Sequence, residues 1–222
     1  MGYYKVPTRN DLKLVKHYIK YLKRVGVSNG LVKLEQMDLI KYIGSGAEKM
    51  VYSIENIDEF VLKIDKSRDE DSGKCRCRLE CYIYREAIKE GYEEYFAPTY
   101  YLGKIGEVTF SLQNKMNVWE DNTYDALCQY ISNNTDDFEY YHNVDEDIEE
   151  DYMDYDMAIS DMSDLEIVSA LFGKTIKGFD NFLDDYNIND LHQGNFGADE
   201  YGNFVIIDYC GYRTDSKTPR KW

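Results

Sequence analysis

Hydrophobic and polar positions alternate with a helical period near the start of the chain. Between residues 9 and 25, apolar side chains recur at steps of three and four, with lysines between them. This spacing is typical of an amphipathic helix, so the sequence predicts a helix over 9–25. We expect Gly26 and the stretch from Ser28 to Gly30 to end it. The apolar stripe consists of Leu12, Val15, Ile19 and Leu22.

The period shortens to that of β-strands beyond residue 38. Short runs of β-branched and aromatic residues are separated by glycines and charged turns, which predicts an antiparallel meander. A helix is predicted over 76–90, between the third and fourth strands. The expected strands cover residues 39–43, 50–54, 60–64, 99–103 and 108–112.

Helical spacing returns in the second half of the chain. The pattern predicts helices over 119–133 and 165–183, then a polar loop over 187–197 and two short strands, of which 204–208 is the clearer. Residues 135–165 are densely acidic and rich in tyrosine, which indicates a solvated loop or insert. The predicted class is therefore α+β, with a β-rich first part and an α-rich second part.

Composition limits the partners and the compartment. The 222 residues are 43% hydrophobic, which is enough to bury one large domain or two small lobes. A net charge of −16 repels phosphate backbones, so we expect no nucleic acid and consider a basic protein as a partner. We also expect no membrane contact and a cytoplasmic protein, because no apolar run could span a bilayer and residues 1–10 lack an apolar signal region.

The five cysteines indicate the same compartment. Cys75, Cys77 and Cys81 form a cluster, whereas Cys128 and Cys210 stand alone. An odd count argues against a secreted disulfide scaffold, and three thiols without an obvious fourth ligand argue against zinc. We therefore expect reduced, structural thiols.

Candidate binding residues gather in the strand-rich part. Gly44, Ser45 and Gly46 form a glycine-rich turn, where the backbone can approach phosphate oxygens. Lys63 lies in an apolar strand, twelve residues beyond Val51, and a charge there is costly to bury unless it is paired. The alternative is a lysine that faces solvent.

The helix over 76–90 supplies two possible partners for Lys63. Glu80 lies on its apolar face, three residues before Ile83, so its carboxylate is expected to point inward and pair with Lys63. Glu86 lies on a more polar side and is the second choice.

Oxygen-bearing side chains mark the polar loop. Asp190 and Asn195 are five residues apart, and Asp208 ends a strand thirteen residues later. Asp190 can accept the proton of an attacking hydroxyl. Asn195 and Asp208 offer the oxygen ligands that Mg²⁺ prefers.

In this order, over residues 38–212, these motifs resemble those of the protein-kinase-like superfamily. The glycine-rich turn is similar to G-x-G-x-x-G-x-V, and Lys63 stands where the lysine of V-A-I-K would be. The loop around Asp190 is similar to H-R-D-L-x-x-x-N, and Asp208 resembles the aspartate of D-F-G. The run Asp-Leu-His-x-Gly-Asn looks more like that of aminoglycoside phosphotransferases. Lys49 replaces the third glycine, and Ile188 and Asn189 stand where His and Arg would be.

The resemblance implies a bilobal protein-kinase-like fold that binds ATP and Mg²⁺. Its expected parts are an N-terminal helical extension (1–37), an antiparallel-sheet N-lobe (38–116) and a truncated helical C-lobe (117–222) with an acidic insert at about 135–165. Only eleven residues follow Gly211, as in minimal kinases of phages and bacterial effectors.

The resemblance also assigns roles to the candidate residues. Asp190 and Lys63 are the implied catalytic residues, and Asn195 and Asp208 the implied metal ligands. Gln113 would be the gatekeeper, the backbone of the following segment would meet the adenine edge, and Val51 would stack above it. The implied nucleotide-binding residues are Gly44, Ser45, Gly46, Val51, Lys63, Glu80, Gln113, Asn114 and Met116.

Three functions fit this pattern. The first is an ATP- and Mg²⁺-dependent phosphotransferase, a minimal protein kinase acting on Ser, Thr or Tyr of a protein. The second is a pseudokinase scaffold that binds a partner protein without catalysis, which the missing third glycine and the absent His-Arg pair favour. The third is a small-molecule kinase. Lys63, Asp190, Asn195 and Asp208 are all retained, each where the chemistry requires it, so we expect the enzyme.

Overall fold

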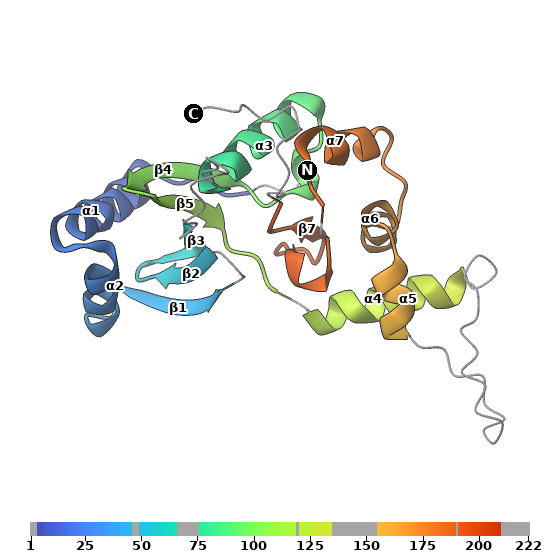
Figure 1. Cartoon of the computed structure of the whole chain (residues 1–222), viewed down its shortest axis with the longest axis horizontal. Helices are drawn as coiled ribbons and strands as arrows, with labels where there is room; N and C mark the ends of the chain where they lie inside the picture. Colours follow the sequence, from blue (N-terminus) through green and yellow to red (C-terminus); the bar gives the residue numbers. More distant parts are fainter. Residues whose placement is uncertain are drawn as a thin grey trace, which may run out of the picture.

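The computed structural model describes residues 4–45, 49–65, 76–118, 120–134, 155–189 and 191–209. Within these residues the protein combines a five-stranded antiparallel sheet with seven α-helices and a separate strand pair, so the predicted α+β class is confirmed (Figure 1). The helices are α1 (Arg9–Val25), α2 (Val27–Gln36), α3 (Arg76–Glu90), α4 (Glu120–Asn133), α5 (Tyr155–Asp161), α6 (Asp164–Phe172) and α7 (Phe179–Tyr186). The strands are β1 (Ile40–Ser45), β2 (Lys49–Ile54), β3 (Ile57–Asp65), β4 (Thr99–Ile105), β5 (Val108–Asn114), β6 (Phe196–Ala198) and β7 (Phe204–Ile206).

The large sheet contains all five strands predicted from the alternating segments. Its order is β1-β2-β3-β5-β4, and every neighbouring pair is antiparallel. The turn between β2 and β3 is tighter than the predicted turn over 55–59, because Asn56 adopts a left-handed conformation with φ of 62° and β3 begins at Ile57. Gly106, with φ of 57°, makes the turn that was predicted between β4 and β5.

Helices α1 and α2 cover one face of this sheet (Figure 1). Helix α1 has the predicted bounds, and a reciprocal capping box between Thr8 and Asp11 fixes its start. The predicted break after α1 is wrong beyond Gly26, because Ser28 to Gly30 lie inside α2. Gly30 allows the two helices to approach closely, since a Cβ there would lie 2.6 Å from Cδ2 of Leu22.

Successive side chains of β3 point to opposite faces of the sheet. Phe60, Leu62 and Ile64 are buried in the hydrophobic cluster beneath α1 and α2. Val61 and Lys63 therefore point to the opposite face, which looks toward α3 and the C-terminal strands.

A second hydrophobic cluster joins α3 to the helices and strands of the C-terminal half. The single helix predicted over 165–183 is two helices, α6 and α7, because Gly173 (φ 64°) and Gly178 (φ 76°) interrupt it. Part of the predicted acidic loop is also helical: α5 buries Ala158 and Ile159 in this cluster. Residues 135–154 of that stretch lie outside the described residues.

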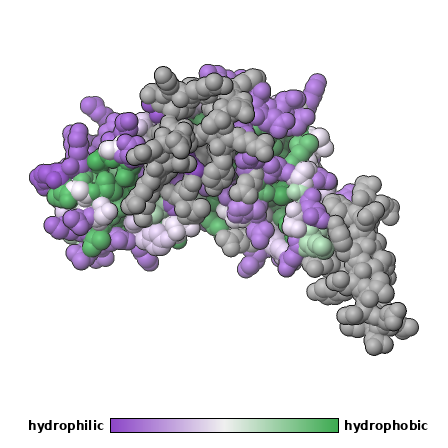
Figure 2. Space-filling model, in the orientation of Figure 1, coloured by the Kyte–Doolittle hydropathy of each residue, from purple (hydrophilic) through white to green (hydrophobic). Residues whose placement is uncertain are grey.

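Figure 2 shows hydrophilic side chains over much of the visible face, with smaller hydrophobic areas between them. In the part of the chain that the structure describes, no helix is both long and apolar enough to cross a membrane.

Candidate functional site

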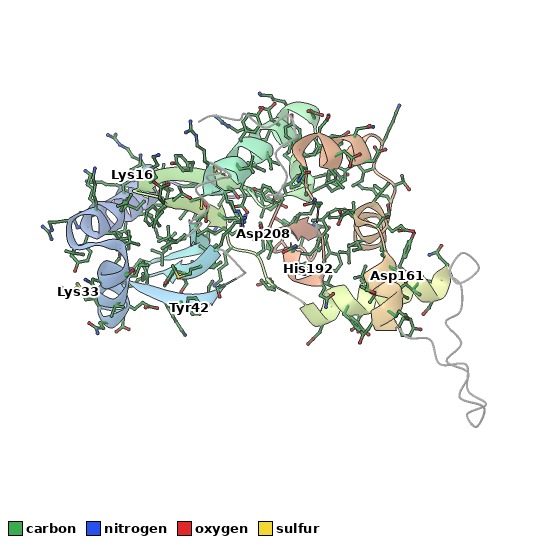
Figure 3. The ribbon with its side chains drawn as sticks, viewed as in Figure 1. Lys16, Lys33, Tyr42, Asp161, His192 and Asp208 are labelled. Atoms are coloured by element: carbon green, nitrogen blue, oxygen red, sulfur yellow. The ribbon has the colours of Figure 1, made fainter. Side chains whose placement is uncertain are left out.

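Four charged side chains meet where the large sheet faces the C-terminal strands. Lys49 comes from β2, Lys63 from β3 and Glu80 from α3, and Asp208 follows β7. We call these four residues the charged cluster. Figure 3 places Asp208 between the sheet and the C-terminal elements.

Lys63 and Glu80 make the contact predicted from the sequence. Their Nζ and Oε1 atoms lie 3.3 Å apart, and both side chains are buried. Lys63 also donates a hydrogen bond of 2.7 Å to the carbonyl oxygen of Ile207. Glu86, the second choice, instead pairs with Lys89 one helical turn away at the surface. The structure therefore brings Glu80, and not Glu86, to Lys63.

Lys49 is the member of the cluster that the sequence reasoning missed. Its Nζ lies 2.7 Å from Oε1 of Glu80 and 2.5 Å from Oδ1 of Asp208, and the residue is only 4% exposed. The alternation of β2 could have revealed it. Val51 pairs with Lys63 across the sheet, so Lys49, two residues earlier, shares the face of Lys63.

The two lysines set the charge of Asp208. Burial alone would raise the pKa of this carboxyl, but Lys49 and Lys63 outweigh that effect and hold the pKa at about 2. Asp208 is therefore ionised at neutral pH, and its side chain keeps 38% of its surface exposed. An exposed carboxylate of this kind can bind a cation.

Glu80 contributes an unusual acceptor to the cluster. Its Oε1 atom accepts from both Lys49 and Lys63, whereas Oε2 is buried and has no hydrogen-bond partner among the described residues. A buried acceptor without a partner costs about 1–3 kcal/mol.

The segment around Asp208 is fixed from the sheet side by a hydrogen-bond network. Gln113 donates from Nε2 to Ile207 O at 3.1 Å and to Thr99 Oγ1 at 2.9 Å. Tyr209, buried beside Phe96, donates from its hydroxyl toward Thr99 Oγ1 at 2.7 Å and Ala97 O at 2.8 Å. The predicted gatekeeper position therefore serves as an anchor, and Tyr209 is a second anchor that sequence reasoning missed.

The polar loop is fixed to the same segment from the other side. Asn195 lies in a short 3₁₀ turn, and its carbonyl oxygen accepts from the N–H of Ile207 at 2.8 Å. The backbone N–H of Leu191 donates to Oδ1 of Asp164 at 2.7 Å, which ties the loop to the first turn of α6. The structure thus brings Asn195 next to Asp208. Asp190, the predicted general base, lies outside the described residues.

The glycine-rich turn is described in part. Gly44 and Ser45 end β1, and Gly46 lies outside the described residues. Val51 is half-buried and directly opposite Lys63 in the β2–β3 register, so it lies on the face of the charged cluster.

The predicted hinge follows β5. The N–H of Asn114 donates to Pro98 O at 3.0 Å, and its side-chain amide donates to Lys5 O at 3.1 Å. The ammonium of Lys5 also pairs with Glu59 at 2.6 Å, so the N-terminal segment runs across this connection. Met116 is half-buried. The next residue, Asn117, pairs with Ala198 of β6 through an isolated β-bridge.

Two hollows lie near these elements. The smaller, about 120 Å³, borders the predicted hinge, and the larger, about 330 Å³, lies at the β1–β2–β3 side of the sheet. Neither of these two hollows is lined by Lys63 or Asp208. The hollow at the hinge is lined by Tyr4, Lys5, Glu59, Asn114, Lys115, Met116, Asp199, Glu200 and Tyr201.

Gly197 in β6 allows a close approach of the segment that follows β5. A Cβ at this position would lie 2.9 Å from Cβ of Met116 and 3.1 Å from the carbonyl oxygen of Asn117. We expect Gly197→Ala to lower the free energy of unfolding by about 1–3 kcal/mol, because a rigid backbone must move. Gly44→Ala is the matched control: nothing lies within 4 Å of its Cβ position, so we expect a change within about 0.5 kcal/mol. Urea denaturation measures both, and equal effects would contradict the packing argument.

A buried thiol lies close to the charged cluster. Cys77 is fully buried beneath the cluster, and burial raises the pKa of its thiol to about 12. Within the described ranges, no three or more His, Cys, Asp and Glu side chains are grouped to hold a metal ion.

A scan against known protein-family models finds no match, and a search of curated proteins finds no similar sequence.

Proposed function

We propose that this chain is an ATP- and Mg²⁺-dependent phosphotransferase of the protein-kinase-like superfamily. The observation that carries the proposal is the buried contact of Lys63 on β3 with Glu80 on α3, beside the ionised carboxylate of Asp208. A buried cation paired in this way, next to a carboxylate that can take a metal ion, is suited to a metal–triphosphate ligand.

The arrangement of the elements supports a bilobal fold. Under the proposal, residues 38–116, with the five-stranded sheet and α3, are the N-lobe, and residues 117–222 belong to the C-lobe. Helices α1 and α2, in the extension over 1–37, cover the face of the sheet that points away from the charged cluster. The two separate hydrophobic clusters are then the cores of the two lobes, apart from α3, whose apolar side chains contribute to the second.

The residues present fit a magnesium ion. Asp208 is ionised and partly exposed, and Asn195 is held beside it through the Ile207 backbone. We propose that the Asp208 carboxylate and the Asn195 side-chain oxygen hold Mg²⁺, since hard cations prefer such ligands. When bound, the ion supplies charge neutralisation for the triphosphate.

The proposed reaction is an in-line phosphoryl transfer. A substrate hydroxyl oxygen forms a bond to the γ-phosphorus, and the bond from that phosphorus to the β–γ bridging oxygen breaks, so that ADP leaves with the electron pair. The hydroxyl proton passes to the carboxylate of Asp190. Lys63, held by Glu80, pairs with phosphate oxygens, and the hinge over 114–116 meets the adenine.

We propose a Ser, Thr or Tyr hydroxyl of a basic protein as the acceptor. The chain carries 42 acidic against 26 basic residues, so a basic substrate is attracted to it and an acidic one is repelled. A small-molecule hydroxyl is the alternative acceptor. Incubation with [γ-³²P]ATP, using histone-like basic proteins and small aminated sugars as separate acceptors, distinguishes the two.

A second function, the non-catalytic scaffold, is favoured by one observation. Lys49 already pairs with Asp208, the carboxylate that the metal ion requires. If that ion pair is permanent, the site holds no metal and the fold serves only to bind a partner protein.

Ligand-dependent melting tests the nucleotide claim. We expect millimolar ATP to raise the melting temperature with Mg²⁺ and to have no effect with EDTA, because the triphosphate needs the metal ion to lie beside Asp208. At a hundredfold excess over Kd, the gain in unfolding free energy is about 2.7 kcal/mol. AMP with Mg²⁺ is the matched control. The absence of any shift with Mg–ATP would reject the nucleotide site and favour the scaffold.

A further inference from the structure

Lys49 has no role in the proposed reaction. It stands on β2, its ammonium group is buried, and it contacts two carboxylates at once, Glu80 at 2.7 Å and Asp208 at 2.5 Å. Lys63, by contrast, lies 3.3 Å from Glu80 and donates a shorter hydrogen bond, of 2.7 Å, to the carbonyl oxygen of Ile207. In this structure Lys49 therefore makes the closer charged contacts of the two.

The charges of the cluster balance. Lys49 and Lys63 contribute two positive charges, and Glu80 and Asp208 two negative ones, so their sum is zero. A buried set of this kind is stable only while each charge has a partner. A divalent ion that binds Asp208 therefore competes with Lys49 for this carboxylate, while Glu80 remains a partner of Lys49 at 2.7 Å.

Two features of the cluster allow a metal ion to replace Lys49 at Asp208. Asp208 is partly exposed, so a metal ion can reach it. Oε2 of Glu80 is buried without a partner among the described residues, so Glu80 can accept Lys63 more closely once Lys49 withdraws from Oε1. A lysine ammonium on its flexible four-carbon stem can change partners in this way.

We propose that Lys49 is a second phosphate-binding residue, and that its ion pair with Asp208 is a resting state which the metal ion of a metal–nucleotide complex displaces. Lys49 then pairs with phosphate oxygens of the nucleotide, while Lys63 stays with Glu80 and the Ile207 carbonyl. This inference rests on the proposed function. It assigns the ligand of Lys49 as a polyphosphate and resolves the apparent conflict between the Lys49–Asp208 pair and metal binding.

The proposal predicts effects of opposite sign for two ligands. In Lys49→Met, we expect Mg–ATP affinity to fall about tenfold or more, because a charge-assisted contact to phosphate is lost. We expect the affinity for Mn²⁺ alone, without nucleotide, to rise at least about threefold, because Asp208 no longer has a competing ammonium at 2.5 Å. A merely structural role for Lys49 would weaken both.

Calorimetry with Mg–ATP and electron paramagnetic resonance with Mn²⁺ measure the two affinities on the full chain. Lys104→Met removes an exposed lysine from β4 of the same sheet and is the matched control, with both affinities unchanged. If thermal melting shows that Lys49→Met is unfolded, Lys49→Gln replaces it in both measurements.

The outcomes separate the two claims. Weaker Mg–ATP with tighter Mn²⁺ in the variant supports the exchange. Unchanged Mg–ATP affinity, or a loss of both affinities, overturns it while the proposed function stands. If the wild-type chain binds Mn²⁺ but no Mg–ATP, the proposed function fails, and with it the phosphate role of Lys49.

Discussion

We expect Glu80→Ala to lower the free energy of unfolding by about 3–5 kcal/mol, the range found when one partner of a buried ion pair is removed. Glu80 is completely buried, and its Oε1 atom accepts from both Lys49 and Lys63. Without it, two buried ammonium groups lose the carboxylate that they share. Equilibrium urea unfolding at pH 7 measures the loss.

Glu86→Ala is the matched control on the same helix. Its partner Lys89 is exposed and lies one turn away, so removal of this pair should change the stability by less than about 0.5 kcal/mol. A loss for Glu80→Ala as small as that of Glu86→Ala would mean that the buried contacts do not hold the sheet to α3.

Asp190→Asn should reduce phosphotransfer by about 10²- to 10⁴-fold, the usual contribution of a positioned general base. Under the proposed function, Asp190 accepts the proton of the acceptor hydroxyl, whereas the nucleotide and metal are held by Lys63, Asn195 and Asp208. Mg–ATP affinity should therefore change by less than about threefold. Rates from ³²P transfer and affinities from calorimetry give the two numbers.

Asp208→Asn provides the contrast for that experiment. The amide has no charge with which to attract the metal ion, so metal-dependent nucleotide binding and transfer should fall together. Full transfer by a verified Asp190→Asn protein would reject the assignment of the polar loop. A cellular phenotype of the wild type that both variants retain would favour the scaffold.

The sheet and α1 followed from local patterns, because strand alternation and helical spacing directly report which face is buried. Helix α3 was predicted with its observed bounds for the same reason. The predictions from sequence patterns were wrong where tertiary packing determined the local structure. Ser28 to Gly30 suggested a turn, yet Gly30 is required in α2 for its close contact with α1. Residues 155–161 were predicted within an acidic loop, yet they form a helix that buries Ala158 and Ile159.

The charged cluster could be predicted only in part. Lys63 and Glu80 stood out because each is a charge within an apolar segment. Lys49 did not, since it follows a glycine-rich turn in which a lysine is ordinary, and its contact with Asp208 spans 159 residues of sequence. Tyr209 was overlooked because its hydroxyl partners, Ala97 and Thr99, lie on a distant strand and loop. Such contacts depend on tertiary structure, which local patterns do not encode.

The contacts of Lys5 with the end of β5 have a practical consequence for anyone producing this protein. Lys5 is held both by its backbone carbonyl, which accepts from Asn114, and by its ammonium, which pairs with Glu59. Trimming the chain to the start of α1 at residue 9, a natural choice for crystallisation, would expose the Asn114 amide and leave Glu59 without this partner. Tags and cleavage sites are therefore better placed upstream of residue 1 with a spacer, so that these contacts survive purification.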